Sequence, residues 1–449
     1  MPLRRSWCRV TISVLPCLAG CETYVAEPVD LAAHAQAFAL RDRNEGRFEP
    51  GTRLDRESGL SLVEARLLAL LLCTDLRAAR LRAGVARVSR DTAGRWDDPE
   101  LSGDFSRILE SVAHPWLAGG SLGFTIPLLG RKAKEKTVAE VEHLRALEEA
   151  KVAETKVLDS LDADWVRWSA ANSRVALLEE LVARLRELEA IAALLASAHE
   201  ITQASARVFG LERVAREIEI ARGKAEVNQL EIAISRWLGL PPRAQGPLVG
   251  TTTIDLRLAS AQQRTAALVT SPRIAVRKAE HQVAEHRYEL AIAKQWPELK
   301  LLPGFQEEDA QPRAAFGVSL PLPLWNKNAR EIAVTRAERS LAAELERGEY
   351  ERLVADLAHA EARLATAREQ RQRVQTELVP LARQQLADAR RQAELGQLDT
   401  LLILDAVLRA HAAATAQLDA SAEEALAVVG LNSLFWPDLG QRPAQQETR

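Results

Sequence analysis

The stretch Gly123-Phe-Thr-Ile-Pro-Leu128 recurs as Gly317-Val-Ser-Leu-Pro-Leu322, 194 positions farther along the chain. Before it, Pro99-Glu-Leu101 recurs as Pro297-Glu-Leu299 at an offset of 198 positions. In both copies a strand-like pattern lies between two helix-like patterns. A period of this length indicates a duplicated structural unit rather than a short solenoid repeat. Each unit holds only two strand-like segments, which are marginally stable alone, so we expect other strands to complete the sheet.

The strand-like segments alternate apolar and polar residues. Apolar side chains recur at every second or fourth position in residues 101–109, 122–126, 299–305 and 316–320. Such alternation suits a membrane β-barrel strand, which turns one face to lipid and the other to water. A half-buried hairpin on the core of a soluble protein is the alternative.

Four tryptophans favour the barrel. Trp96, Trp296 and Trp325 lie outside the strand-like segments at one end, and Trp116 lies near the hairpin loop at the other. Amphipathic aromatic rings at both ends of apolar strands are typical of the interfacial girdles of membrane barrels.

A long helical pattern follows each hairpin. Residues 132–208 contain no Pro or Gly, which predicts a helix of about 115 Å at about 1.5 Å per residue. The second long pattern, from about Asn328 to Leu395, contains Pro380, where we expect a kink. We expect the two helices to end at Gly210 and Gly396 and returning helices to follow. Ala198-His199 is a weaker alternative for the first turn.

The N-terminus has the pattern of an export signal. Basic residues precede a short apolar stretch, 10–18, which ends in Leu18-Ala-Gly-Cys21. A Cys at this position resembles the bacterial lipoprotein box, so we expect residues 1–20 to be a signal peptide and Cys21 to carry a diacylglycerol. An ordinary signal peptide with an incidental Cys is the alternative. Glu22, in place of Asp, favours sorting to the outer membrane.

Bulk composition excludes several classes of protein. The 449 residues carry a formal net charge of −3, without the basic excess expected of a nucleic-acid-binding protein. The longest apolar runs fall short of 18 residues, so a transmembrane helix is not expected. Residues 22–58 have little periodicity and indicate a tail or linker.

The chain offers little for catalysis or metal binding. With Cys21 acylated, Cys73 is the one Cys left in the mature chain, and we expect it to be a small buried side chain. His281 and His286 are five residues apart and fall on different faces of a helix. No nucleophile, phosphate-binding or zinc motif occurs, so we expect no enzyme, no cofactor and no metal site.

The mature chain resembles the TolC family of outer-membrane efflux proteins and, within it, the CzcC-like branch that serves heavy-metal efflux. The segment Phe316-Gly-Val-Ser-Leu-Pro-Leu-Pro-Leu-Trp-Asn-Lys-Asn328 is similar to the strand-to-helix junction of that branch. Residues 378–406 are similar to its second helical hairpin. The first unit matches more loosely, at residues 62–65, 99–101 and 126–130.

The resemblance implies a mainly α fold with a small β part. Coiled-coil hairpins would form an α-barrel, and four strands per chain would complete a twelve-stranded transmembrane β-barrel in a homotrimer. The chain would then comprise a tail (21–59), two repeats (60–245 and 258–440, with hairpins at about 100–127 and 297–321) and a disordered tail (441–449). The implied partners are outer-membrane lipid, a periplasmic adaptor and an inner-membrane pump of the resistance-nodulation-division type.

The resemblance also assigns a role to the two helix turns. In TolC-like channels these turns form the periplasmic tip, where ionic links close the pore and adaptor hairpins dock. The corresponding residues are Gly210, Arg213, Gly396, Asp399, Thr400 and Asp405. The first turn departs from the family pattern, because Leu211-Glu-Arg213 replaces an expected small hydroxyl residue. Solvated turns with Gly at the helix end are the alternative.

The resulting functional expectation is a passive outer-membrane channel of a Gram-negative bacterium that exports heavy-metal cations. An exit duct for drugs, organic solutes or secreted polypeptide is an alternative, and the identity of the neighbouring pump gene discriminates between these cargoes. A soluble periplasmic coiled-coil scaffold is an alternative of another class.

Overall fold

The computed structural model describes residues 23–42, 59–109, 115–308, 311–395 and 399–435. The expected signal peptide with Cys21, the turn residue Gly396 and the tail 441–449 lie outside these ranges. The chain divides into two compact units, residues 1–41 and 42–449.

The described part of the first unit contains the helix α1 (Leu31–Leu40). The carboxylate of Asp30 accepts hydrogen bonds from the backbone nitrogens of Ala32 and Ala33, both at 3.0 Å. An Asp cap before an alanine-rich segment favours a helix. The segment expected to be a tail or linker thus contains one helix of 10 residues.

The second unit contains one order of elements twice. The first copy comprises α2 (Leu62–Leu72), α3 (Thr74–Thr92), β1 (Glu100–Arg107), β2 (Trp116–Ile126), α4 (Arg131–Ser197) and α5 (Gln203–Trp237). The second comprises α6 (Ala261–Ala267), the 3₁₀ turn η3 (Leu268–Thr270), α7 (Pro272–Ala293), β3 (Leu299–Glu308), β4 (Gln311–Ser319), α8 (Ala329–Arg373), the π-helical turn η4 (Val374–Leu378), α9 (Val379–Glu394) and α10 (Thr400–Asn432). The duplication indicated by the repeated stretches is thus present in the order of helices and strands.

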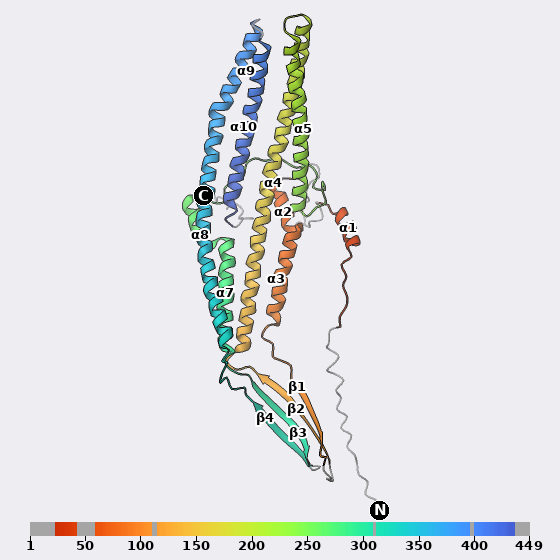
Figure 1. Cartoon of the computed structure of the whole chain (residues 1–449), viewed down its shortest axis with the longest axis vertical. Helices are drawn as coiled ribbons and strands as arrows, with labels where there is room; N and C mark the ends of the chain where they lie inside the picture. The colour runs from red at the N-terminus through yellow and green to blue at the C-terminus, as the bar shows by residue number, and fades with distance from the viewer. Residues whose placement is uncertain (1–22, 43–58, 110–114, 309–310, 396–398, 436–449) are drawn as a thin grey trace, which may run out of the picture. The chain divides into compact units, whose positions relative to one another are not determined.

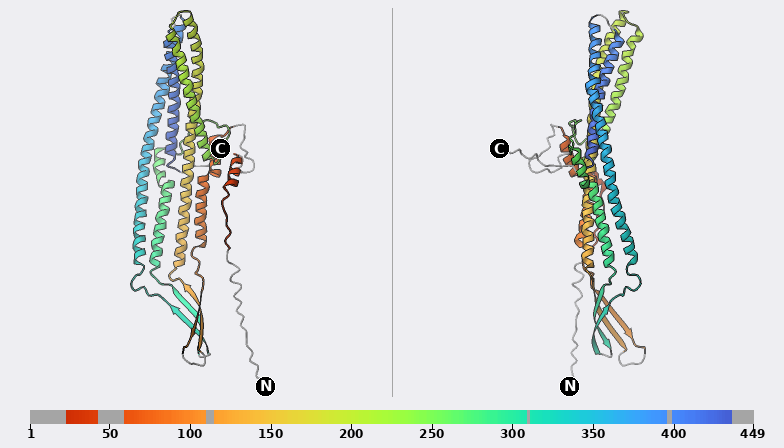
Figure 2. Two further views of the ribbon diagram at one scale, coloured as in Figure 1. Left: turned by 45° about the vertical axis from the view of Figure 1, so that its right-hand side comes forward. Right: turned by 90° about the vertical axis from the view of Figure 1, so that its left-hand side faces the viewer.

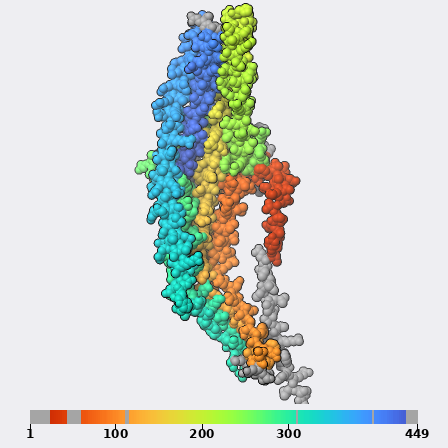
Figure 3. Space-filling model, viewed as in Figure 1, coloured from red at the N-terminus to blue at the C-terminus, as the bar shows by residue number. Residues whose placement is uncertain are grey.

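Within this unit the long helices lie side by side in one layer (Figures 1 and 2). Near the sheet the neighbours run α3, α4, α7 and α8, and in the other half they run α5, α4, α10 and α9. The 67-residue helix α4 belongs to both halves and connects them. Figure 3 shows the strands at the opposite end of the unit from the α4–α5 and α9–α10 hairpins.

The turn between α4 and α5 lies at residues 198–202, so the turn expected at Gly210 is wrong. His199 adopts φ = 63°, and the Thr202 hydroxyl accepts a hydrogen bond from the backbone nitrogen of Ser205 at 3.1 Å. These local contacts end one helix and cap the next without a glycine. Gly210 lies inside α5, where an added Cβ would come within 2.7 Å of the Glu189 Oε1 atom. A larger residue at this position would require the end of the Glu189 side chain to move.

The sequence predicts a kink at Pro380, and the structure has the π-helical turn η4 just before this proline. Proline has no N–H to donate and its ring clashes with the carbonyl of the preceding turn. Widening that turn to a π-helical hydrogen-bond pattern relieves the clash. α9 therefore continues from α8 with a local change of helical pitch.

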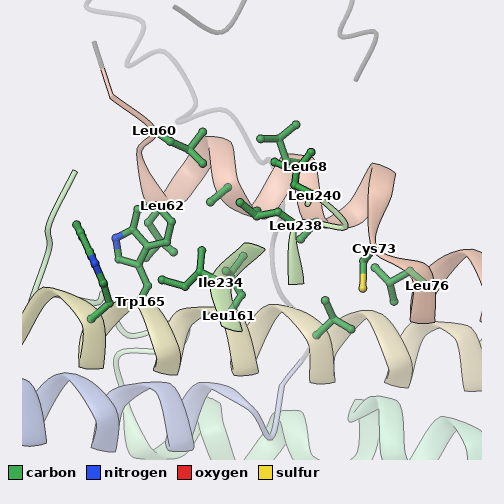
Figure 4. Close-up of a cluster of buried hydrophobic side chains, with 14 residues drawn as sticks. Leu60, Leu62, Leu68, Cys73, Leu76, Leu161, Trp165, Ile234, Leu238 and Leu240 are labelled. Atoms are coloured by element: carbon green, nitrogen blue, oxygen red, sulfur yellow. The ribbon is translucent and has the colours of Figure 1, made fainter. Parts of the chain in front are cut away.

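The largest core of the second unit packs α2 against the middle of α4 (Figure 4). Trp165 and Leu161 of α4 are fully buried there, together with Ile234, Leu238 and Leu240 at and beyond the end of α5. The Trp165 Nε1 atom donates a hydrogen bond to the carbonyl of Val249, which holds the segment between the two repeats in place. Cys73 is buried in the same cluster, as expected.

One helix of the described chain, α10, is long and apolar enough to cross a membrane by length and composition alone. The core helix of a soluble protein can pass the same test, so this finding does not contradict the expectation that no helix of the chain crosses the membrane. The apolar character comes from alanine and leucine spread over the whole helix rather than from one uninterrupted run. α10 packs against α4, α8 and α9, which is the position of a helix in the wall of the layer.

Replacing Gly239 with Ala should destabilise the fold. Gly239 has φ = +65°, and an added Cβ would come within 2.2 Å of the Leu72 carbonyl oxygen. We expect a loss of more than about 1 kcal/mol of unfolding free energy, measured by circular dichroism during thermal unfolding. In the control Gly348→Ala, the added Cβ meets nothing within 4 Å inside α8, so stability should not fall. Equal melting temperatures for the Gly239→Ala and Gly348→Ala variants would contradict this prediction.

Candidate functional site

The four strands form one antiparallel sheet in the order β1-β2-β3-β4. β2 pairs with β3 although a helical hairpin and the inter-repeat segment separate them in sequence. β1 and β4 are the outer strands, and each has one neighbour in the described chain. Each outer strand therefore offers an unpaired row of backbone hydrogen-bonding groups.

One face of this sheet is apolar across all four strands. Directly paired residues share a face, and the pairs include Leu101–Leu122, Phe124–Leu301 and Leu301–Val318. The alternation predicted separately in each strand thus coincides on a single surface. Leu101 is 82% exposed and Phe316 is 67% exposed. A patch of this kind on a soluble monomer would be unusual and marks a contact surface.

The opposite face is polar and rich in glycine. The Ser102 and Ser121 hydroxyls lie 2.7 Å apart, and the Lys300 Nζ atom lies 3.1 Å from the Glu100 Oε1 atom across β2. Asp104 occupies the same face, two residues beyond Ser102. The sheet therefore has one face suited to hydrocarbon and one suited to water.

The four expected interfacial tryptophans lie at the two ends of the sheet and are exposed. Trp116 begins β2, opposite Arg107, whose guanidinium lies 5.4 Å from the centre of the Trp116 ring. Trp96, Trp296 and Trp325 lie just outside the other ends of the strands. This arrangement matches the positions predicted from the sequence.

Arg213 ties the two helices of the first hairpin together near their turn. Its Nε atom donates to the Glu189 Oε2 atom at 2.7 Å, and its Nη1 atom donates to the Glu217 Oε2 atom at 2.9 Å. Arg186 reaches Glu217 from α4 at 2.8 Å. Hydrogen bonds from Arg186 and Arg213 hold the pKa of Glu217 below its ordinary value. The network spans residues on both sides of the turn.

The candidate residues of the second hairpin have local partners. The Asp399 carboxylate caps α10 by accepting from the backbone nitrogens of Leu401 and Leu402 at 3.0 and 3.1 Å. Thr400 is the first residue of α10. The Asp405 Oδ2 atom accepts from the Arg409 Nε atom at 2.7 Å and from the Gln385 Nε2 atom at 3.3 Å. Asp405 therefore also connects α10 to α9.

A group of ion pairs fastens the middle of α4 to the segment between the repeats. The Arg257 Nη2 atom lies 3.0 Å from the Asp159 Oδ1 atom, and its Nη1 atom donates to the carbonyls of Asn432 and Phe435 at 2.7 and 2.9 Å. Arg66 of α2 donates to both oxygens of Asp162, at 2.7 and 2.8 Å. The group joins α2, α4 and the end of α10.

Burial raises the pKa of Asp159 to about 6, against the opposing attraction of Arg257. Its side chain is only 12% exposed, and the neighbouring Asp162 adds to the increase. Asp159 is not distinguished by any motif in the sequence. Charged residues are common in helical stretches, and only burial distinguishes Asp159 from its solvated neighbours.

The described residues hold no cluster of three or more His, Cys, Asp or Glu side chains suited to a metal ion. His281 pairs with Glu346 at 2.8 Å, and His286 pairs with Glu289 at 3.3 Å. The two histidines thus have separate carboxylate partners.

The fold that these features define is that of outer-membrane channel proteins. A membrane protein from Pseudomonas aeruginosa is 18% identical with a TM-score of 0.72, and the match covers 89% of this chain and 95% of that one. CusC is 16% identical with a TM-score of 0.70, covering 89% and 98%. The Campylobacter jejuni CmeC outer membrane channel is 13% identical with a TM-score of 0.69, covering 93% and 95%. No family model and no curated protein matches the chain.

Replacing Asp159 with Asn should change how stability depends on pH. The pKa of about 6 in the folded chain exceeds the ordinary 3.8, so the folded chain binds this proton more tightly than the unfolded chain. Protonated Asp159 therefore contributes to the unfolding free energy below pH 3.8. This contribution falls by up to about 3 kcal/mol as pH rises through 6.

Thermal unfolding of the Asp159→Asn variant should lack this decline between pH 4 and pH 6. The control variant Ser160→Asn keeps the Asp159 carboxyl group. Its stability should therefore decline with pH as that of the parent chain does. Parallel pH profiles for Asp159→Asn and the parent chain would exclude Asp159 as the titrating group.

Proposed function

We propose that three copies of this chain form a passive channel through the outer membrane of a Gram-negative bacterium. Their sheets join edge to edge into a transmembrane β-barrel, and their helices form a tunnel into the periplasm. The channel couples through a periplasmic adaptor to an inner-membrane pump of the resistance-nodulation-division type. The pump supplies the energy, and no catalytic step occurs in this chain.

The observation that carries this proposal is an apolar sheet face bounded by two open edges. Unpaired backbone groups cost several kcal/mol each in hydrocarbon, so a sheet that faces lipid must close on itself. The four strands of one chain are too few to close, and β1 and β4 are free to pair with β4 and β1 of other copies. Edge-to-edge assembly removes both open edges. The exposed apolar face also argues against a soluble scaffold.

The helical layer supports the same assembly. Its outer members are α3 and α8 in one half and α5 and α9 in the other, so both halves end in helices with one open side. On α5, Leu211, Val214 and Ile218 are exposed at spacings of three and four residues. Such a stripe is the usual contact surface of a helix that packs against another helix.

The ends of the two helical hairpins form the periplasmic tip in this proposal. Around a threefold axis, Asp399, Asp405 and Arg213 each become a ring of charge, and such rings select or restrict ions. Gly210 lies two turns from the first hairpin turn and supports the Arg213–Glu189 contact there. Adaptor binding at this tip then shifts the balance between a closed and an open pore.

Metal cations are the proposed cargo, and Cys21 is the proposed site of a lipid anchor. The cargo is supported by the resemblance of residues 316–328 and 378–406 to the heavy-metal branch of the TolC family. The anchor is supported by the Leu-Ala-Gly-Cys pattern at residues 18–21. A metal-type pump encoded beside this chain would support the cargo, and a drug or polypeptide exporter there would oppose it.

Replacing Phe316 with Arg should block insertion into the outer membrane. Phe316 lies on the apolar face, where a midplane Arg costs about 2–4 kcal/mol in a membrane barrel. We expect the variant to be depleted from carbonate-washed outer membranes. The control Ala315→Arg places the same charge on the opposite, polar face and should remain in the membrane. Equal membrane yields for both variants would contradict a lipid-facing Phe316.

The purified chain should form ion-conducting pores in planar bilayers, and neutralising Asp399 and Asp405 should raise the single-channel conductance. Asn at 399 can still cap α10, so the double variant Asp399→Asn, Asp405→Asn changes charge while keeping the helix start. The double variant Asp75→Asn, Glu377→Gln loses equal charge far from the tip and serves as the control. Parent-like conductance in the Asp399/Asp405 variant would remove these residues from the gate, and absence of any pore would reject the channel.

A further inference from the structure

A groove of about 730 Å³ lies between the end of α3 and the first turns of α4. The charged side chains lining it are Arg90, Asp91, Arg95, Lys136 and Glu140, and His143 lies beside them. Arg90 and Asp91 pair with each other at 2.7 Å. The groove lies on α3 and α4, which belong to the wall of the proposed tunnel, at the end of these helices that is nearest the sheet.

The cations at the start of α4 differ in whether they are paired. Arg131 reaches Glu298 at 2.6 Å, Lys132 reaches Asp97 at 3.1 Å, and Lys134 lies 3.6 Å from Glu289. Lys136, which lines the groove, has no carboxylate partner in the described ranges. Among the four cations at the start of α4, Lys136 is therefore the one without an ion-pair partner in the described chain, and it lines the groove.

Two other charges in the groove are also unmatched within the described chain. Arg95 makes no ion pair, and neither does Glu140, one helical turn beyond Lys136. A Lys that precedes a Glu by four residues pairs less favourably on a helix than the reverse order, because both then oppose the helix dipole. Two cations and one carboxylate therefore remain available to a ligand.

The Nδ1 atom of His143, closed off from solvent, also lacks a hydrogen-bond partner.

The groove also adjoins the proposed membrane boundary. Arg95 directly precedes Trp96, which is 65% exposed, and β1 begins four residues after that tryptophan. Exposed tryptophans next to membrane strands sit at the level of the lipid headgroups. If the sheet is the membrane-spanning part, as proposed above, the groove lies where periplasm-facing headgroups are found.

We propose that this groove binds the phosphoethanolamine headgroup of an outer-membrane phospholipid. Arg95 and Lys136 bind the phosphate, because guanidinium and ammonium groups form charge-assisted hydrogen bonds with phosphate oxygens. Glu140 accepts hydrogen bonds from the primary ammonium group. A phosphoglycerol headgroup leaves Glu140 unmatched, and a phosphocholine headgroup has no N–H to donate. The charges of the groove therefore select a primary amine.

Native mass spectrometry of the full chain in detergent, titrated with dioleoyl lipids, tests this proposal. The parent chain should bind the phosphatidylethanolamine more tightly than the phosphatidylglycerol or the phosphatidylcholine. The double variant Arg95→Gln, Lys136→Gln should bind phosphatidylethanolamine about tenfold more weakly or worse. Glu140→Gln should abolish the preference for phosphatidylethanolamine over phosphatidylglycerol.

The matched control is Arg82→Gln, Lys151→Gln, which removes one cation from α3 and one from α4 outside the groove. It should bind phosphatidylethanolamine like the parent chain. Absence of a preference in the parent chain, or equal binding by the groove variant and the control, would overturn the proposal. Equally tight binding of soluble glycerophosphoethanolamine would assign the groove to a free phosphodiester instead of a lipid. The conductance of the same parent preparation in planar bilayers tests the channel separately. Failure of the lipid-binding proposal can therefore be distinguished from failure of the proposed channel function.

Discussion

A β-sheet that faces hydrocarbon needs every backbone N–H and C=O group paired, because lipid offers no substitute for water. The sheet of this chain meets that requirement between its own strands and leaves it open at β1 and β4. The apolar face makes the sheet suited to a membrane. In hydrocarbon, however, the unpaired backbone groups at its two open edges would be energetically costly. In the proposed assembly, pairing with the β1 and β4 strands of other copies resolves this conflict.

The arrangement of the strands also restricts how the helices can be placed. Each strand is adjacent in sequence to a helix of the layer. In the proposed assembly, chains that join through their sheets would therefore also bring α3 and α8 of neighbouring copies together. α4 runs through both halves of the layer and carries this geometry to the far turns. Arg257, Asp159 and the end of α10 fasten the layer at its middle, where the two repeats meet. Continuous, packed helices thereby connect the turns of the two helical hairpins to the sheet.

The two repeats share their order of elements and differ in the details that matter for a site. The first hairpin turns through His199 and Thr202 and is fastened by Arg213. In the second, Asp399 caps the returning helix. The groove beside Trp96 depends on Arg95 and Lys136, whereas the corresponding helix of the second repeat begins with its own set of charges. The two halves therefore share one scaffold and present different surfaces.

Local pattern was sufficient to predict the strands, the aromatic ends and the order of helices, because alternation and long runs without Pro or Gly depend only on neighbouring residues. It was insufficient for the first helix turn. Gly210 has the residue type of a helix end, yet the space it leaves is filled by Glu189, a contact made across the hairpin. The buried Asp159 was likewise invisible among many charged residues. The alternation within each strand and the length of each helix depend on nearby residues, so they can be read from the chain alone. The shared face of the strands and the pairing of charges depend on segments that are distant in the chain, so they are defined only in the folded protein.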